Sequence, residues 1–250
     1  DLQGPKLRIG TVEEGAFLDP GDLMTFTNKP CSGTKEKVFM TYDSFPKDVK
    51  VGEMIMLDDG KLLMRVVSSN SKNEVIAETI QGGSLKSNKG VNLPNTRVSL
   101  PCLTDKDIYD LNIALDAGVD WVGLSFVRGK QDIKDLRKII NEKKSSAGII
   151  AKIEKPEAVS DIDAILDETD AVMVARGDLG VEVPMESVPL IQKMIISKAI
   201  SRAKPVIVAT QMMESMINSL TPSRAEVNDV SCAVIDLSLI HISEPTRQQG

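Results

Sequence analysis

Three charged residues that follow apolar runs could together bind a divalent metal and a phosphoryl group. Lys152 and Glu154 come at the end of an apolar run that begins at residue 148, and residues two apart in an extended strand point to the same face. Asp178 follows a second apolar run, at residues 171–174, and Gly177 before it allows close approach of the backbone. An ammonium and two carboxylates at the ends of two strands suit metal binding and stabilisation of a phosphoryl or enolate oxygen.

Composition excludes several classes of function. The 250 residues are 42% hydrophobic and 26% charged, enough to form one large domain or two smaller ones. A net charge of −6 and only 3% aromatic residues argue against a nucleic-acid partner. No apolar stretch approaches the roughly 20 residues needed to span a bilayer, so no membrane association is expected. The three widely spaced cysteines are expected to be reduced thiols of a cytoplasmic protein.

The segment at residues 9–95 has the pattern of a small all-β domain. Short apolar runs alternate with turn residues at positions 19–22, 58–60, 70–73 and 82–83. The Asp-Asp-Gly sequence at residues 58–60 lies between two such runs and predicts a hairpin.

From residue 96 onward, amphipathic helices alternate with apolar strands. Helices are expected after Thr104 with Gly118 at the end, at residues 131–141, from Pro156 through 166, at about 186–202 and at 223–235. The strands between them are expected at residues 119–126, 148–154, 171–174 and 205–210. This alternation predicts a parallel sheet covered by helices on at least one face.

Both a doubly wound sheet and a (β/α)₈ barrel have this alternation. The barrel is favoured because the polar residues gather after the strands, as in Ser125, Lys152, Arg176 and Thr210, and barrels carry their active sites at the carboxyl ends of the strands. No Gly-x-Gly-x-x-Gly sequence opens a helix, which weakens the case for a dinucleotide-binding fold. With four whole βα units the barrel is expected to be partial. The fold class is therefore α/β, a partial TIM barrel with an inserted small all-β barrel domain.

Six segments in the expected order closely resemble pyruvate kinases. They are DLQGP at residues 1–5, KGVNLP at 89–94, SFVR at 125–128, KIE at 152–154, MVARGDLG at 173–180 and ATQMMESM at 209–216. The resemblance implies transfer of a phosphoryl group between phosphoenolpyruvate and ADP, with protonation of the enolate to pyruvate and formation of ATP. It also implies that the all-β insertion is the lid domain of this family.

The resemblance assigns roles to individual residues. Lys152 would stabilise charge on the transferring phosphoryl group, Thr210 would bind substrate close to the site of enolate protonation, and backbone amides around Gly177 would receive the substrate carboxylate. The implied metals are Mg²⁺ or Mn²⁺ and K⁺. The implied metal and nucleotide contacts are Glu154 and Asp178 for Mg²⁺, Asp1 and the carbonyl of Leu2 for K⁺, and Arg8 and Lys89 for the nucleotide phosphates.

The resemblance also predicts the domain boundaries. Residues 1–8 are expected to end the third barrel strand, residues 9–95 to form the lid, and residues 96–236 to form βα units four to seven with the following helix. Residues 237–250 match nothing in the family and are expected to be an artefact. The first two barrel strands and the regulatory C-terminal domain of the family are absent, so the chain is expected to be an inactive fragment of a homotetrameric cytoplasmic enzyme of glycolysis.

Other interpretations stay open at this point. Lys152 and Glu154 could form an ordinary ion pair at a sheet end. A metal-dependent barrel lyase or aldolase acting through a pyruvate enolate would also pair a Glu with an Asp, and a truncated chain could be a non-catalytic assembly partner. Residues 58–60 could carry a lid carboxylate that reaches toward nucleotide-bound metal. The one histidine, His241, lies in the segment expected to be an artefact, so histidine chemistry is not expected.

Overall fold

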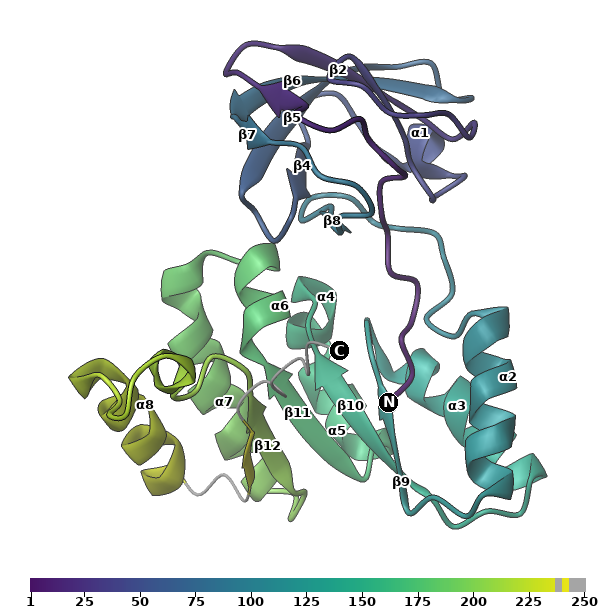
Figure 1. The fold of residues 1–250 in the computed structure, drawn as a ribbon. Helices are drawn as coiled ribbons and strands as arrows, with labels where there is room; N and C mark the ends of the chain where they lie inside the picture. The colour runs from purple at the N-terminus through teal and green to yellow at the C-terminus, as the bar shows by residue number, and fades with distance from the viewer. Residues whose placement is uncertain (237–239, 243–250) are drawn as a thin grey trace. The chain divides into compact units, whose positions relative to one another are not determined.

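The computed structural model describes residues 1–236 and the backbone of residues 240–242. The chain divides into two compact units, which are described separately (Figure 1). Residues 6–100 form a β unit, and residues 1–5 with the chain from residue 101 onward form an α/β unit. The expected lid limits, 9 and 95, lie a few residues inside those of the β unit. None of the helices within the described residues is long and apolar enough to cross a membrane.

The β unit is built on a six-stranded sheet in the order β3-β2-β6-β5-β4-β8. Its pairs are antiparallel except for β2 with β3. A separate antiparallel pair joins β1 to β7. The elements are β1 (Phe17–Leu18), β2 (Leu23–Thr27), β3 (Lys37–Phe39), α1 (Phe45–Asp48), β4 (Met54–Leu57), β5 (Leu62–Ser69), β6 (Glu74–Gln81), β7 (Gly83–Ser84) and β8 (Val91–Asn92).

The hairpin predicted at residues 58–60 is confirmed. It joins β4 to β5, and Asp58, Asp59 and Gly60 have φ values of 51°, 58° and 84°. Positive φ at successive turn residues is the geometry that matches the twist of paired strands, and Asp and Gly tolerate it best. The unit has its own core, in which the rings of Phe26 and Phe45 meet edge to face with centroids 5.7 Å apart.

The α/β unit is built on a parallel sheet in the order β13-β12-β11-β10-β9. The strands are β9 (Trp121–Leu124), β10 (Gly148–Ile153), β11 (Ala171–Ala175), β12 (Val206–Ala209) and β13 (Ile240–Ile242). The helices are α2 (Asp105–Asp116), α3 (Lys130–Glu142), α4 (Pro156–Ser160), α5 (Ile162–Glu168), α6 (Arg176–Glu182), α7 (Val188–Ile200) and α8 (Arg224–Ile235), with 3₁₀ turns η1 (Met185–Ser187) and η2 (Glu214–Ile217).

The sheet curls, and helices α3, α5 and α7 pack side by side against it (Figure 1). Strand faces directed toward these helices supply the core, including Ile149, Ala151 and Ile153 of β10. A curled parallel sheet with successive helices on its outer side is part of a (β/α)₈ barrel, so the predicted partial barrel is confirmed and the doubly wound alternative is wrong. All strands run in one direction, so their carboxyl ends share one edge.

Local signals predicted the ends of α2 correctly. Thr104 caps the helix, because its hydroxyl accepts from the backbone N–H of Asp107 while the Asp107 carboxylate accepts from the N–H of Thr104. Gly118 just past the helix end has φ of 78°, the left-handed geometry for which glycine is preferred.

Three helix predictions were wrong in detail. The helix from Pro156 is broken into α4 and α5 at Asp161, whose backbone leaves helical geometry and whose carboxylate accepts from the N–H of Lys130. The long helix expected from residue 186 starts with a 3₁₀ turn and becomes regular only at α7. The amphipathic helix expected at residues 223–235 is α8, but Val227 and Val234, which helical spacing puts on one face, are 48% and 54% exposed.

Candidate active site

The register of the sheet brings the predicted strand-end residues together. Lys152 of β10 pairs with Met173 of β11. Glu154 directly follows β10 and α6 directly follows β11, so both lie at the carboxyl ends of neighbouring strands. Ala175 of β11 pairs with Ala209 of β12, so Arg176 and Thr210 come next at the same edge. The polar residues that follow these strands therefore lie at one edge of the sheet, because the strands have similar lengths and run in the same direction.

Lys152 is the centre of a polar cluster. Its Nζ lies 3.0 Å from Oε1 of Glu154, 2.8 Å from Oγ of Ser125 and 3.3 Å from Oδ2 of Asp1. The expected proximity of Lys152 and Glu154 is confirmed. The Lys152 side chain is only 15% exposed, so this ammonium is a largely desolvated positive charge at the strand ends.

Glu154 is nearly fully buried, with 2% of its surface exposed. Burial raises its pKa above the ordinary value, the ammonium of Lys152 opposes this, and the negative charge of Asp178 raises the pKa further. The second carboxylate oxygen accepts a hydrogen bond of 2.9 Å from the N–H of Phe126. Asp178, in the first turn of α6, therefore adds to the effect of burial on the pKa of Glu154.

The donor set fits a divalent cation that is completed by other ligands. The carboxylates of Asp1, Glu154 and Asp178 and the single ammonium of Lys152 leave a net side-chain charge of minus two. Within residues 1–236 no group of three or more His, Cys, Asp and Glu side chains could hold a metal ion by itself. Mg²⁺ is commonly bound through one or two carboxylates plus substrate phosphates and water, so Glu154 and Asp178 suit that role.

Thr210 and Gly177 are in direct contact. The N–H of Gly177 donates to Oγ1 of Thr210 at 2.7 Å. A Cβ added to Gly177 would lie 3.2 Å from the same oxygen, which explains why glycine suits this position. Gly177 lies in the first turn of α6, where a backbone N–H has no partner within the helix, and the Thr210 hydroxyl supplies that partner.

Residues 1–5 lie along the edge of the sheet. The N–H of Leu2 donates to the carbonyl of Gly123 at 2.8 Å, and Leu2 pairs with Leu124 in parallel. Leu2 is 5% exposed. This pairing holds the carboxylate of Asp1 near Lys152, so the two residues predicted to bind K⁺ are beside the cluster.

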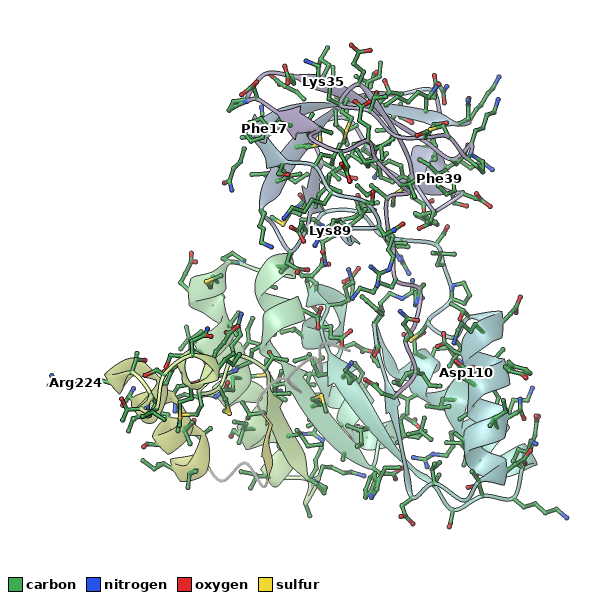
Figure 2. All side chains as sticks on the ribbon, in the orientation of Figure 1. Phe17, Lys35, Phe39, Lys89, Asp110 and Arg224 are labelled. Atoms are coloured by element: carbon green, nitrogen blue, oxygen red, sulfur yellow. The ribbon has the colours of Figure 1, made fainter. Side chains whose placement is uncertain are left out.

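Arg8 and Lys89, predicted to contact nucleotide phosphates, lie together in the β unit. The N–H of Ile9, next to Arg8, donates to the carbonyl of Lys89, and the Arg8 guanidinium donates to the carbonyl of Asn88 at 2.8 Å. Lys89, labelled in Figure 2, has its Nζ 2.8 Å from Oδ1 of Asp58. The hydrogen bond from Lys89 lowers the pKa of the Asp58 carboxyl. The two cations are therefore neighbours.

The sequence did not assign a role to two buried residues that directly follow strands of this sheet. Ser125 is 4% exposed and binds the Lys152 ammonium. Arg176 is 8% exposed and binds the backbone carbonyl of Thr210 and the carboxylate of Asp229. Their position directly after strands was a signal for both, but nothing in the sequence pointed to Asp229, which lies 53 positions beyond Arg176.

Comparisons with known proteins identify the family of this chain. The family model described as the barrel domain of pyruvate kinase matches residues 1–242. The chain is 49% identical over 237 residues to a pyruvate kinase of Corynebacterium glutamicum and 45% identical over 237 residues to one of Mycobacterium tuberculosis, in both cases over 94% of this chain and 50% of the relative. The chain thus spans about half the length of these curated relatives.

A solved structure of a pyruvate kinase also matches the fold of this chain. The crystal structure of a pyruvate kinase from Cryptosporidium parvum superposes with a TM-score of 0.91 at 38% identity, over 97% of this chain and 51% of that chain. The family match extends to residue 242, and Ile240–Ile242 pairs in parallel with β12. The expectation that residues 237–250 are an artefact stays a prediction, and most of that segment lies outside the described residues.

Proposed function

Because the chain belongs to the pyruvate kinase family, we propose that its matched residues serve the transfer of a phosphoryl group from phosphoenolpyruvate to ADP, which yields pyruvate and ATP. The observation that carries the proposal is the Lys152 ammonium held 3.0 Å from the buried carboxylate of Glu154. The pKa of that carboxyl is raised by burial and by the negative charge of Asp178. Phosphoryl transfer needs positioning and charge neutralisation more than covalent chemistry, and this cluster supplies both.

Lys152 acts as a fixed positive charge. Its ammonium is held by Ser125, Glu154 and Asp1, so it needs little reorganisation to stabilise negative charge on the phosphoryl group as that group leaves the enolate oxygen. Its low exposure strengthens the interaction relative to one in water.

Glu154 and Asp178 would hold Mg²⁺ or Mn²⁺, which when bound polarises the phosphoryl and enolate oxygens as a Lewis acid. Burial and the negative charge of Asp178 raise the cost of ionising Glu154, and a divalent cation would relieve it. The resemblance places K⁺ at the carboxylate of Asp1 and the carbonyl of Leu2. The position of Asp1 beside Lys152 supports this assignment, because a monovalent cation there would add positive charge next to the same oxygens.

In this proposal the backbone N–H of Gly177 binds the substrate carboxylate, and Thr210 binds substrate close to the site of enolate protonation. The Gly177 N–H now donates to the Thr210 hydroxyl, and a carboxylate oxygen can take over as its acceptor while the hydroxyl turns to donate to substrate.

Arg8 and Lys89 would bind the nucleotide phosphates. Lys89 already pairs with Asp58, so a polyphosphate must compete with that carboxylate or share the ammonium with it. The role in glycolysis, the cytoplasmic location and the homotetrameric assembly of the whole enzyme are proposed from family membership.

A hybrid enzyme tests the proposal. The matching half of the Corynebacterium glutamicum pyruvate kinase is replaced by the matched residues of this chain, and pyruvate formation from phosphoenolpyruvate is assayed with ADP, Mg²⁺ and K⁺. We expect turnover of about 1–10³ s⁻¹, the range of ordinary enzymes. A folded hybrid that forms no pyruvate, or that cleaves a 2-oxo acid without need for ADP, would overturn the proposal.

A further inference from the structure

Arg176 is buried but is not used in the roles above. It is 8% exposed, and burying a guanidinium is costly unless every edge of it is paired. One edge, Nη1, lies 2.6 Å from Oδ1 of Asp229. On its other edge, Nε and Nη2 both donate to the backbone carbonyl of Thr210, at 3.2 Å and 2.6 Å. The guanidinium therefore links a carboxylate of α8 to the residue proposed to bind substrate.

The backbone that Arg176 holds is strained. Thr210 has φ of 70° and Gln211 has φ of 55°, both in the left-handed region. A β-branched residue there is uncommon and costs about 1–3 kcal/mol, and it persists only where neighbouring groups hold it. The two hydrogen bonds from Arg176 fix the carbonyl of Thr210. The Thr210 side chain is attached to the Cα next to this carbonyl, so the two hydrogen bonds also help to fix the position of Oγ1. That oxygen lies 2.7 Å from the Gly177 nitrogen.

The far end of the same loop is fastened independently. The carboxylate of Glu226 accepts from the N–H of Ser215 at 2.8 Å and from the N–H of Ser223 at 2.7 Å, and it also accepts from both serine hydroxyls. These bonds, led by the one from the Ser215 hydroxyl, lower the pKa of Glu226 to about 2. Removing Arg176 should therefore release the Thr210 end of the loop and leave the other end attached to α8.

We propose that Arg176, oriented by Asp229, is a positioning residue that sets the Thr210 hydroxyl at the substrate site. The proposal rests on the function proposed above for Thr210. A purely structural ion pair would affect the stability of the fold and leave the folded enzyme with normal turnover. Lysine cannot replace this arginine, because an ammonium on a flexible stem does not offer the planar fork that binds the carbonyl and the carboxylate together.

The first test measures the position of Thr210 directly. In the 250-residue chain, hydrogen exchange of the Gly177 amide reports its bond to the Thr210 hydroxyl. We expect Arg176→Gln to speed this exchange by about tenfold. The control is Arg137→Gln, which removes a guanidinium with the same kind of partners, the Glu168 carbonyl and the Asp170 carboxylate. Unchanged Gly177 exchange in Arg176→Gln would overturn the proposal.

The second test is a double-mutant cycle in the hybrid enzyme. Arg176→Gln and Thr210→Val should each lower kcat by about 10- to 100-fold with little change in KM for ADP, and the double variant should be no slower than the slower single variant. Arg176→Lys should recover thermal stability and remain slow. Hydrogen–deuterium exchange into the methyl group of pyruvate should fall in parallel, since it follows enolate protonation.

Losses in kcat that multiply in the double variant would show that Arg176 acts apart from Thr210. Full turnover of Arg176→Lys would show that only the charge matters, and either result contradicts the proposal.

The proposed function and the positioning role of Arg176 are contradicted by different results. If the unmutated hybrid transfers no phosphoryl group while Gly177 exchange still responds to Arg176→Gln, the proposed function falls and the positioning of Thr210 stands.

Discussion

Replacing Glu154 with glutamine should abolish stabilisation of the chain by Mn²⁺. Glu154 is 2% exposed and contacts the Lys152 ammonium and the Phe126 N–H. A glutamine of the same size still offers an oxygen to the Phe126 N–H, so the local fold is expected to survive. What it removes is the negative charge of one of the two carboxylates proposed to bind the metal.

The magnitude follows from linkage between binding and folding. Mn²⁺ at about 100 times its Kd stabilises a folded protein by about 2.7 kcal/mol. For a domain of this size class that raises Tm by about 5–10 °C. Losing a supporting group near a metal weakens binding 10- to 100-fold, so losing a direct ligand should weaken it by at least about 100-fold. At the same Mn²⁺ concentration the stabilisation should then fall below about 0.5 kcal/mol.

Thermal unfolding with and without Mn²⁺ measures this effect. Trp121 is the single tryptophan and lies in β9, so its fluorescence follows the α/β unit alone. The matched control is Glu157→Gln in α4, which changes the same residue type near the end of β10 and should keep the full Mn²⁺ shift. An equal Mn²⁺ shift in Glu154→Gln and in the unmutated chain would refute the assignment of Glu154 as a ligand, as would no shift in the unmutated chain.

Three further predictions concern charges at the strand ends. Because the folded-state pKa of Glu154 is raised by burial, the folded state keeps this proton to higher pH than the unfolded state. Without metal, the free energy of unfolding of the unmutated chain should therefore fall relative to that of Glu154→Gln as pH rises from about 4.5 through the raised pKa of Glu154. Below that range Glu154 is protonated in both states, so the difference between the two chains in urea unfolding should vanish. Lys155→Met should cost about 3–5 kcal/mol in urea unfolding, because it removes the ammonium 2.6 Å from the Glu182 carboxylate, whose side chain is 2% exposed. Adding Glu182→Leu should recover most of that loss, and a double variant as unstable as the sum of both would contradict this. Lys152→Met in the hybrid enzyme should lower kcat by about 100- to 1000-fold, and turnover near that of the unmutated hybrid would contradict its role.

The parts of the site that could be predicted from the sequence are those set by local patterns. Lys152 and Glu154 directly follow an apolar run, and alternation along a strand was enough to place them on one face. Parallel strands meet at one edge, and the charge of Asp178, just after β11, adds to the effect of burial on the pKa of Glu154. The hairpin at residues 58–60 was predictable because its positive φ values restrict which residues fit.

The remaining contacts depend on closure of the chain over long distances. Arg176 meets Asp229 across 53 positions and Lys152 meets Asp1 across 151, and no periodicity encodes either pair. At the helix break, the Asp161 carboxylate accepts a hydrogen bond from the N–H of Lys130 in a different helix, a contact that no local pattern encodes. Helix patterns likewise could not show that Val227 of α8 stays half exposed, because they identify an apolar stripe without identifying what covers it.

The account rests on one ammonium and two carboxylates arranged around a single divalent cation. The most direct measurement is the anomalous difference density of Mn²⁺ in crystals of the 250-residue chain. The predicted result is one Mn²⁺ ion about 2.1 Å from an oxygen of Glu154 and about the same distance from an oxygen of Asp178, with the Lys152 ammonium beside it. Mn²⁺ bound only by other carboxylates, with Glu154 and Asp178 both outside its coordination shell, would contradict the account.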